Sequence, residues 1–203
     1  MNDRVRSILP RPQGGTVSSE RIAVLVDGSN VYATTKAIGL EIDYKLFIDY
    51  YRAQGKLLRI SYYTALLEEP NITQSIKPLI DWLDYNSFDV VSKVAKKFTN
   101  EHTGVVKIKG NMDIEIATDA MSLAASGRVD HIILYTGDGD FTYLVEKLKM
   151  SPVRVTVVST ITTQPPMCAD ELRRSADEFI DLFNMREHFL KERGHARRES
   201  TGR

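Results

Sequence analysis

Two aspartates lie two residues apart in the segment Thr-Gly-Asp-Gly-Asp at 136–140. The apolar run before it, Ile132 to Tyr135, has the length and composition of a strand buried on both faces, and helical spacing begins at Phe141. Asp138 and Asp140 therefore lie on a tight turn between a strand and a helix. Like charges this close repel one another unless a proton or a cation lies between them. The alternative is that both are simply turn and helix N-cap residues.

Two further aspartates occupy related positions. Asp27 ends the strand-like run from Ile22 to Val26, and Asp113 begins a helix that leads into the strand at 132–135. In a parallel sheet, the ends of the strands and the starts of such helices share one edge, where ligands bind. Oxygen-only ligands favour Mg²⁺ or Mn²⁺ over zinc. We therefore expect one metal site formed by Asp27, Asp113, Asp138 and Asp140, although each residue taken singly is equally well explained as a cap or turn residue.

Polar residues near these aspartates are candidate contacts to substrate. Ser29, Asn30 and Thr136 could orient a ligand, a water or a phosphate, and Lys109 could contact a substrate backbone. Asn30 is equally well explained as a helix N-cap. Asp119 is turned about 120° around the helix from Asp113. We interpret Asp119 as a structural residue, with a supporting role behind the metal ligands as the alternative.

The elements that must position these residues alternate along the chain. Strands are expected over 22–26, 57–66, 88–98, 132–135 and 153–158, and helical spacing follows each of them, interrupted by Pro78 in the helix at 72–86. This alternation predicts an α/β fold, a single Rossmann-like three-layer domain with a mainly parallel sheet. Residues 105–108 are expected to extend the strand at 88–98 as a hairpin.

The two ends of the chain differ from this core. Residues 1–20 are polar and contain Pro and Gly, which predicts a disordered leader before a domain at 21–185. Residues 186–203 are expected to be the end of a charged helix that starts near 184, followed by an Arg-rich tail. A homodimer could form through an edge strand or through the helix at 182–192.

Composition limits the partners and the compartment. The 203 residues are 42% hydrophobic and 27% charged, with a formal net charge of zero, so a polyanion site requires local clustering of cations. Four lysines on the expected hairpin could form such a surface, or could protect an edge strand from aggregation: Lys93, Lys96, Lys97 and Lys107. One cysteine excludes an internal disulfide and a cysteine-based zinc site. The absence of a signal peptide and of a long apolar run predicts a soluble, cytoplasmic protein without a membrane contact.

Three motifs, in order, carry a family resemblance. They are Val-Asp-Gly-Ser-Asn at 26–30, Lys-Gly-x-x-Asp at 109–113 and Thr-Gly-Asp-Gly-Asp-Phe at 136–141. Together they resemble the NYN domain, a PIN-like nuclease fold, and are most similar to its LabA-like bacterial branch, over about residues 21–185. The middle motif is one residue longer than is usual in the family. The resemblance implies an RNA-directed, Mg²⁺-dependent nuclease with the four aspartates as its catalytic residues and metal ligands.

We therefore predict a ribonuclease that uses an Asp-bound Mg²⁺ or Mn²⁺ to hydrolyse phosphodiester bonds, with single-stranded RNA as the expected substrate. The main alternative is a non-catalytic protein on the same fold that binds RNA or a regulatory partner. The segment at 138–142 also fits the nucleophile loop of haloacid-dehalogenase-like phosphatases. That family places the loop on its first strand, however, and leaves Asp27 and Asp113 unexplained. An EF-hand is excluded, because Tyr143 and Lys149 stand where Gly and Glu are required.

Overall fold

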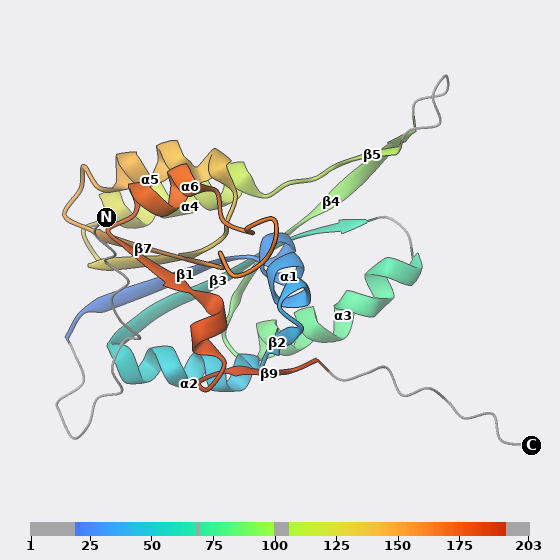
Figure 1. The fold of residues 1–203 in the computed structure, drawn as a ribbon, viewed down its shortest axis with the longest axis horizontal. Helices are drawn as coiled ribbons and strands as arrows, with labels where there is room; N and C mark the ends of the chain where they lie inside the picture. Colours follow the sequence, from blue (N-terminus) through green and yellow to red (C-terminus); the bar gives the residue numbers. More distant parts are fainter. Residues whose placement is uncertain (1–18, 68–69, 100–105, 194–203) are drawn as a thin grey trace, which may run out of the picture.

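The computed structural model describes residues 19–67, 70–99 and 106–193, and these residues form a twisted sheet covered by helices on both faces (Figure 1). The strand order is β5-β4-β3-β1-β6-β7-β8. Six neighbouring strands run parallel, and β5 pairs antiparallel with β4. The strands are β1 Arg21–Asp27, β3 Lys56–Leu67, β4 Asp89–Thr99, β5 Val106–Lys109, β6 His131–Tyr135, β7 Arg154–Ser159 and β8 Glu178–Asp181. The predicted Rossmann-like α/β fold and the hairpin extension are confirmed.

Six helices connect the strands, and the structure shows why one of them begins, and why another ends, at its particular residue. The helices are α1 Gly28–Ala37, α2 Tyr44–Gln54, α3 Pro70–Tyr85, α4 Asp113–Ala125, α5 Thr142–Leu148 and α6 Asp170–Ser175, with single 3-10 turns at η1 Gly139–Phe141 and η2 Leu182–Met185. The carboxylate of Asp43 accepts hydrogen bonds from the backbone N–H groups of Lys45 and Leu46, which starts α2. Gly39, with φ of +72°, allows the chain to turn after α1.

Alternate residues of the central strands enter two separate cores. Val24 and Val26 of β1 pack on one face with α1, α2 and α3, whereas Ala23 and Leu25 pack on the other face with α4, α5 and α6. β6 lies beside β1 and is buried along its whole length. A strand that is apolar on both faces therefore lies between two helical layers, as the continuous apolar runs predicted.

The order of the strands defines where a ligand would bind. From β1 the chain adds β3 and β4 on one side, then returns to place β6, β7 and β8 on the other side. The switch point therefore lies between β1 and β6, at the carboxyl edge of the sheet, where open α/β folds bind ligands. Asp27 ends β1, and the Thr-Gly-Asp-Gly-Asp segment follows β6.

A second, two-stranded sheet was not predicted. β2, Leu40–Ile42, pairs antiparallel with β9, Leu190–Glu192. The prediction of a helix from about 184 is therefore wrong: η2 is followed by turns and then by β9. The backbone N–H of Asp43 donates to the carbonyl of Phe189 over 2.8 Å, and Phe189 is fully buried. Tertiary pairing and burial thus override a segment whose local sequence favours a helix.

Two predictions on the ends of the chain fall partly outside the described residues. The expected leader lies almost wholly within residues 1–18, and the Arg-rich tail beyond Arg193 is likewise outside. The helix at 182–192, one of the two surfaces suggested for a homodimer, is not formed. Among the helices of the described segments, none is long and apolar enough to cross a membrane.

Candidate metal centre

Asp27 is the buried residue around which the site is built. It ends β1, and its side chain is only 6% exposed. One carboxylate oxygen accepts hydrogen bonds from the Ser29 hydroxyl at 2.8 Å and from the backbone N–H of Asn30 at 3.1 Å. Asp27 is therefore also the N-cap of α1. The other oxygen accepts from the Thr136 hydroxyl at 3.2 Å, which links the ends of β1 and β6.

The loop after β6 is fixed to α1 by side-chain hydrogen bonds. The amide oxygen of Asn30 accepts from the backbone N–H of Gly137 at 2.9 Å. Thr136 is buried, and its hydroxyl oxygen accepts from the backbone N–H of Asp138 at 3.2 Å. Asn30 is thus not the N-cap of α1, because Asp27 has that role. The predicted ligand contacts Ser29, Asn30 and Thr136 all support the loop and the carboxylates within the protein.

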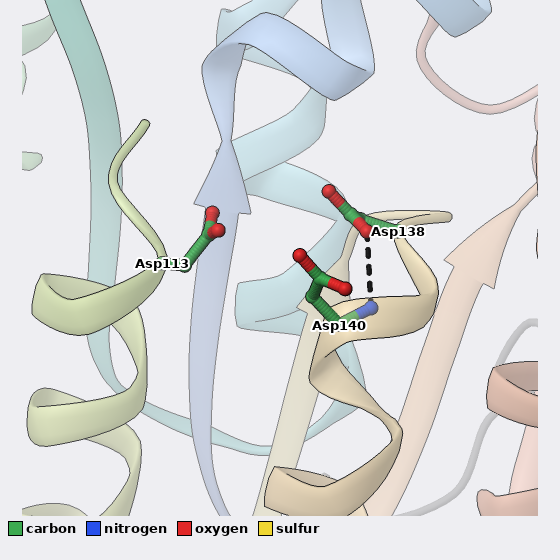
Figure 2. A group of neighbouring side chains, drawn as sticks. All are labelled: Asp113, Asp138 and Asp140. Carbon is green, nitrogen blue, oxygen red and sulfur yellow. Dashed lines mark hydrogen bonds between the residues drawn. The ribbon is translucent and has the colours of Figure 1, made fainter. Parts of the chain in front are cut away.

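Asp138 lies directly before a single 3-10 turn, and Asp140 lies within that turn. The carboxylate of Asp138 accepts from the backbone N–H of Asp140 at 3.0 Å and caps η1 (Figure 2). Asp140 lies inside the turn, so the alternative that it is the N-cap of the following helix is wrong. Its carboxylate faces the same space as that of Asp138 (Figure 2).

Asp113 reaches this space from the opposite side. It is the first residue of α4, whose N-cap, Met112, makes no side-chain capping bond. The side-chain amide of Asn111 donates a short hydrogen bond to the Asp113 carboxylate. Figure 2 shows Asp113 across the end of β1 from Asp138 and Asp140. The additional residue in the middle motif does not keep Asp113 away from the others.

The three surface carboxylates come close enough to share one ion. Asp113, Asp138 and Asp140 each offer one oxygen, and these atoms lie within 4.8 Å of one another. The pKa of Asp113 is raised above its ordinary value. Partial burial is the largest cause, and the negative charges of Asp138, Asp27 and Asp140 add to it, whereas the positive charge of Lys93 opposes the shift. Asp27 therefore acts on Asp113 through its charge, although it is not in the group of three.

The chemistry of this donor set fits a hard divalent cation. All candidate ligand atoms are carboxylate oxygens, which suit Mg²⁺ or Mn²⁺ rather than zinc. The accumulated negative charge disfavours ionisation of Asp113, and a cation would remove that penalty. The three carboxylates come from two separate parts of the chain, the start of α4 and the turn after β6. Among the described hydrogen bonds, none links Asp113 to Asp138 or Asp140.

Asp119 and Lys93 have partners outside this group of three. The carboxylate of Asp119 accepts from the Tyr63 hydroxyl at 2.8 Å and lies 3.9 Å from Arg59, in agreement with its structural interpretation. Lys93 forms an ion pair with Glu115 at 2.9 Å, so part of its positive charge is neutralised within the protein. The side chains of Lys109, Lys96, Lys97 and Lys107 lie outside the described part of the structure. Asn111 was not predicted as a site residue, although its position inside the motif at 109–113 could have indicated a contact with Asp113.

The fold and this site define a class: a Rossmann-like α/β protein with an acidic centre at the switch point of its sheet. Residues 21–183 match the NYN domain, and the chain belongs to that family. It is 31% identical over 174 residues to the low amplitude and bright protein LabA of Synechococcus elongatus (strain ATCC 33912 / PCC 7942 / FACHB-805), covering 84% of this chain and 88% of that protein. The resemblance to the LabA-like branch is confirmed.

A solved structure supports the same assignment. The fold is similar to that of VPA0982, a protein of unknown function from Vibrio parahaemolyticus RIMD 2210633, with a TM-score of 0.66 and 27% sequence identity. The similarity covers 87% of this chain and 99% of the other. Most of this chain and nearly all of that protein therefore share one fold.

Proposed function

We propose that this protein is a metal-dependent ribonuclease that hydrolyses phosphodiester bonds of single-stranded RNA. The observation that carries the proposal is the convergence of Asp113, Asp138 and Asp140, whose oxygens lie within 4.8 Å of one another at the switch point of the sheet. Membership of the NYN family, whose PIN-like fold is that of nucleases, supports the same chemistry. A single carboxylate would not suffice, because a cap or turn role explains it equally well.

In this proposal the aspartates have different tasks. Asp113, Asp138 and Asp140 hold Mg²⁺ or Mn²⁺, and Asp27 closes the site from its buried side as a fourth candidate ligand. The bound ion supplies Lewis-acid catalysis at the phosphate. Thr136, Asn30 and Ser29 are positioning residues, since their hydrogen bonds hold Asp27 and the loop that carries Asp138. Lys109, the last residue of β5, is a candidate contact to the RNA backbone.

The proposed reaction adds water across one phosphodiester bond. The water oxygen forms a bond to phosphorus, the bond from phosphorus to the 3′ oxygen breaks, and a proton passes from the water to that oxygen. The products are a 5′-phosphate and a 3′-hydroxyl. The protein contributes orientation and fixed negative charge: the loop at 136–140 is held by hydrogen bonds at both ends, so the carboxylates are preorganised.

The test is cleavage of a labelled single-stranded RNA in Mn²⁺ by the parent protein and by Asp138→Asn. Removing this carboxylate is expected to lower kcat at least about 100-fold, given that even residues behind metal ligands cost 10- to 100-fold. Glu146→Gln is the matched control, because it removes one negative charge from an exposed position on α5. The control should retain the parental rate.

The same assay separates the proposal from the non-catalytic alternative. A parent protein that binds the RNA but releases no 5′-phosphate product in Mg²⁺ or Mn²⁺ would be an RNA-binding protein on a nuclease fold. Cleavage that is equal in parent and Asp138→Asn would come from a contaminant or another site. Either result would contradict the proposed role of the three carboxylates.

A further inference from the structure

A cavity of about 580 Å³ lies beside α1, between that helix, α3 and the small sheet of β2 and β9. Figure 1 shows these elements grouped on one side of the main sheet, opposite α4, α5 and α6. The volume lies within the range of sites that bind small ligands or parts of larger ones. None of its lining residues belongs to the acidic group of three.

Four aromatic side chains line this cavity. Tyr32 of α1 is 58% exposed and Trp82 of α3 is 37% exposed, so two large rings from different helices are open to solvent. Below them, Tyr44 and Tyr62 pack edge to face with ring centroids 5.9 Å apart. Exposed rings cost free energy in water unless something covers them, and a nucleic-acid base covers such rings by stacking.

Cationic side chains line the same cavity. The guanidinium of Arg193 lies 4.8 Å from the centroid of the Tyr32 ring, and no carboxylate in the described part of the chain forms an ion pair with it. Lys191 lies 3.5 Å from Glu41 and 4.0 Å from Asp43, so acidic residues partly neutralise this amine. The chain as a whole has no net charge, so a polyanion must be attracted by local positive charge. Arg193 supplies such a charge at this cavity. An aromatic surface next to a cation is typical of sites for single-stranded nucleic acid.

The cavity and the acidic centre share the start of α1. Gly28 directly follows Asp27, and a Cβ at Gly28 would lie 2.7 Å from the Tyr62 ring, so the backbone at the end of β1 rests on the cavity wall. Tyr32 lies four residues further on, about 6 Å along the helix axis. A strand of RNA that crosses the first turn of α1 would therefore reach both places.

We propose that this cavity binds a base of single-stranded RNA next to the phosphodiester bond held at the acidic centre. Tyr32 and Trp82 stack on the base, and Arg193 attracts the adjoining phosphate. The inference rests on the proposed function for the identity of the ligand, but the cavity itself is separate from the catalytic carboxylates. It explains why two large aromatic side chains of the same cavity are open to solvent.

The protein contains its own reporter for this contact. Trp82 is the one tryptophan among the 203 residues, so its fluorescence reports on the cavity alone. The experiment is titration of the full chain with a ten-residue single-stranded RNA in EDTA, which prevents cleavage. We expect saturable quenching of Trp82. Tyr32→Ala should raise the Kd about 5- to 150-fold, the effect of losing one stacked base.

Two further variants make the result specific. Tyr85→Ala is the control, because Tyr85 is 89% exposed on the same helix as Trp82 but does not line the cavity. It should bind with the parental Kd. Arg193→Ala should weaken binding and flatten its salt dependence, and it provides an independent test if Tyr32→Ala does not fold. Quenching that is absent or not saturable, or an equal loss of affinity in Tyr85→Ala, would overturn the inference.

Cleavage assays distinguish failure of this inference from failure of the proposed function. In Mn²⁺, Tyr32→Ala is expected to raise KM more than it lowers kcat, whereas Asp138→Asn should lose kcat and still quench Trp82 with RNA in EDTA. Quenching without cleavage in the parent would retain the base-binding cavity and reject the nuclease. Cleavage with a parental KM in both Tyr32→Ala and Arg193→Ala would retain the nuclease and reject the cavity.

Discussion

The hydroxyl of Thr136 donates a hydrogen bond to the carboxylate of Asp27 over 3.2 Å, across 109 residues of sequence. The same oxygen accepts from the backbone N–H of Asp138 at 3.2 Å. One buried side chain therefore fixes the positions of both the Asp27 carboxylate at the end of β1 and the start of the acidic turn after β6. The threonine therefore connects the two strand ends that carry Asp27 and Asp138.

Removing the hydroxyl tests this role. Thr136→Val keeps the shape of the side chain but leaves a buried carboxylate oxygen of Asp27 without its donor, so we expect a loss of about 1–3 kcal/mol in the free energy of unfolding. RNA cleavage should fall as well, because Asp138 is no longer held. Urea denaturation and the cleavage assay measure the two effects. Thr136→Ser retains the hydroxyl and should stay close to the parent, and a fully stable, active Val variant would refute the role.

The two glycines of the acidic turn are expected to respond differently to substitution. A Cβ at Gly137 would overlap the carbonyl oxygen of Met167 and lie 2.5 Å from the Ser159 hydroxyl. A Cβ at Gly139 would lie 2.9 Å from a carboxylate oxygen of Glu171, an exposed side chain that can move away. Gly137→Ala should therefore cost about 1–3 kcal/mol and Gly139→Ala much less. Equal thermal midpoints for the two variants would show that the backbone after β6 is free to shift.

Asp113 is expected to lower stability when no metal is bound. Its pKa is raised by partial burial and by neighbouring carboxylates, so its ionised form is disfavoured in the folded protein. Stability therefore falls as the pH rises through the raised pKa, and the penalty persists above it. Asp113→Asn should melt at a higher temperature than the parent in EDTA at pH 7, and this difference should shrink as the pH falls toward 4.

Metal should reverse that order. Mn²⁺ is expected to raise the thermal midpoint of the parent by binding only the folded state, and to raise that of Asp113→Asn less. Thermal unfolding with and without Mn²⁺ gives both values in one series. Glu146→Gln is again the control for loss of one charge. An Asn variant that is less stable than the parent in EDTA would mean that Asp113 is held by attractive contacts instead.

His131, at the opposite end of β6 from the acidic turn, is expected to make the stability of the protein depend on pH in a second way. Burial and the charge of Arg154 lower the pKa of this histidine to about 4, against the opposing effect of Glu20. Its two ring nitrogens lie 2.7 Å from the Thr156 hydroxyl and 2.9 Å from the Arg154 guanidinium. Because the unfolded chain takes up the proton near pH 6.5 and the folded protein only near 4, stability is lost as the pH falls through that window.

The check is the urea midpoint of unfolding between pH 7 and pH 5. The parent should lose stability over this range, and His131→Gln, which has no titrating ring, should lose less. The Gln variant is expected to be less stable than the parent at pH 7, since the contacts of the ring are lost. Identical slopes in the two proteins would exclude His131 as a source of the pH dependence.

Much of the fold follows from local patterns. The apolar runs at β1, β6 and β7 and the helical spacing between them predict a parallel sheet, and these three strands do run parallel to one another. The convergence of Asp113 with Asp138 and Asp140 could also be predicted, because right-handed connections bring strand ends and helix starts to one edge. These features depend on periodicity and topology, which a sequence carries.

Other features depend on contacts that no spacing reveals. β2 and β9 are three residues each and pair across about 150 residues of chain, so their strand character comes from the pairing itself. The ion pair between Lys93 and Glu115 likewise depends on tertiary packing, so the spacing of the lysines did not predict it. The aromatic cavity combines Tyr32 and Trp82 from two helices, and neither residue belongs to a motif. The hydrogen bond between Asp27 and Thr136 likewise depends on the pairing of β1 with β6, which the spacing of residues does not reveal.

We expect Asp113, Asp138 and Asp140 to form one divalent-metal site. A crystal of the parent protein soaked in Mn²⁺ and measured for anomalous scattering tests this directly. It should show one or two manganese peaks coordinated by carboxylate oxygens of these three residues, and a crystal of Asp138→Asn should show none. A parent crystal that binds Mn²⁺ elsewhere, or shows no peak between these side chains, would contradict a shared metal site.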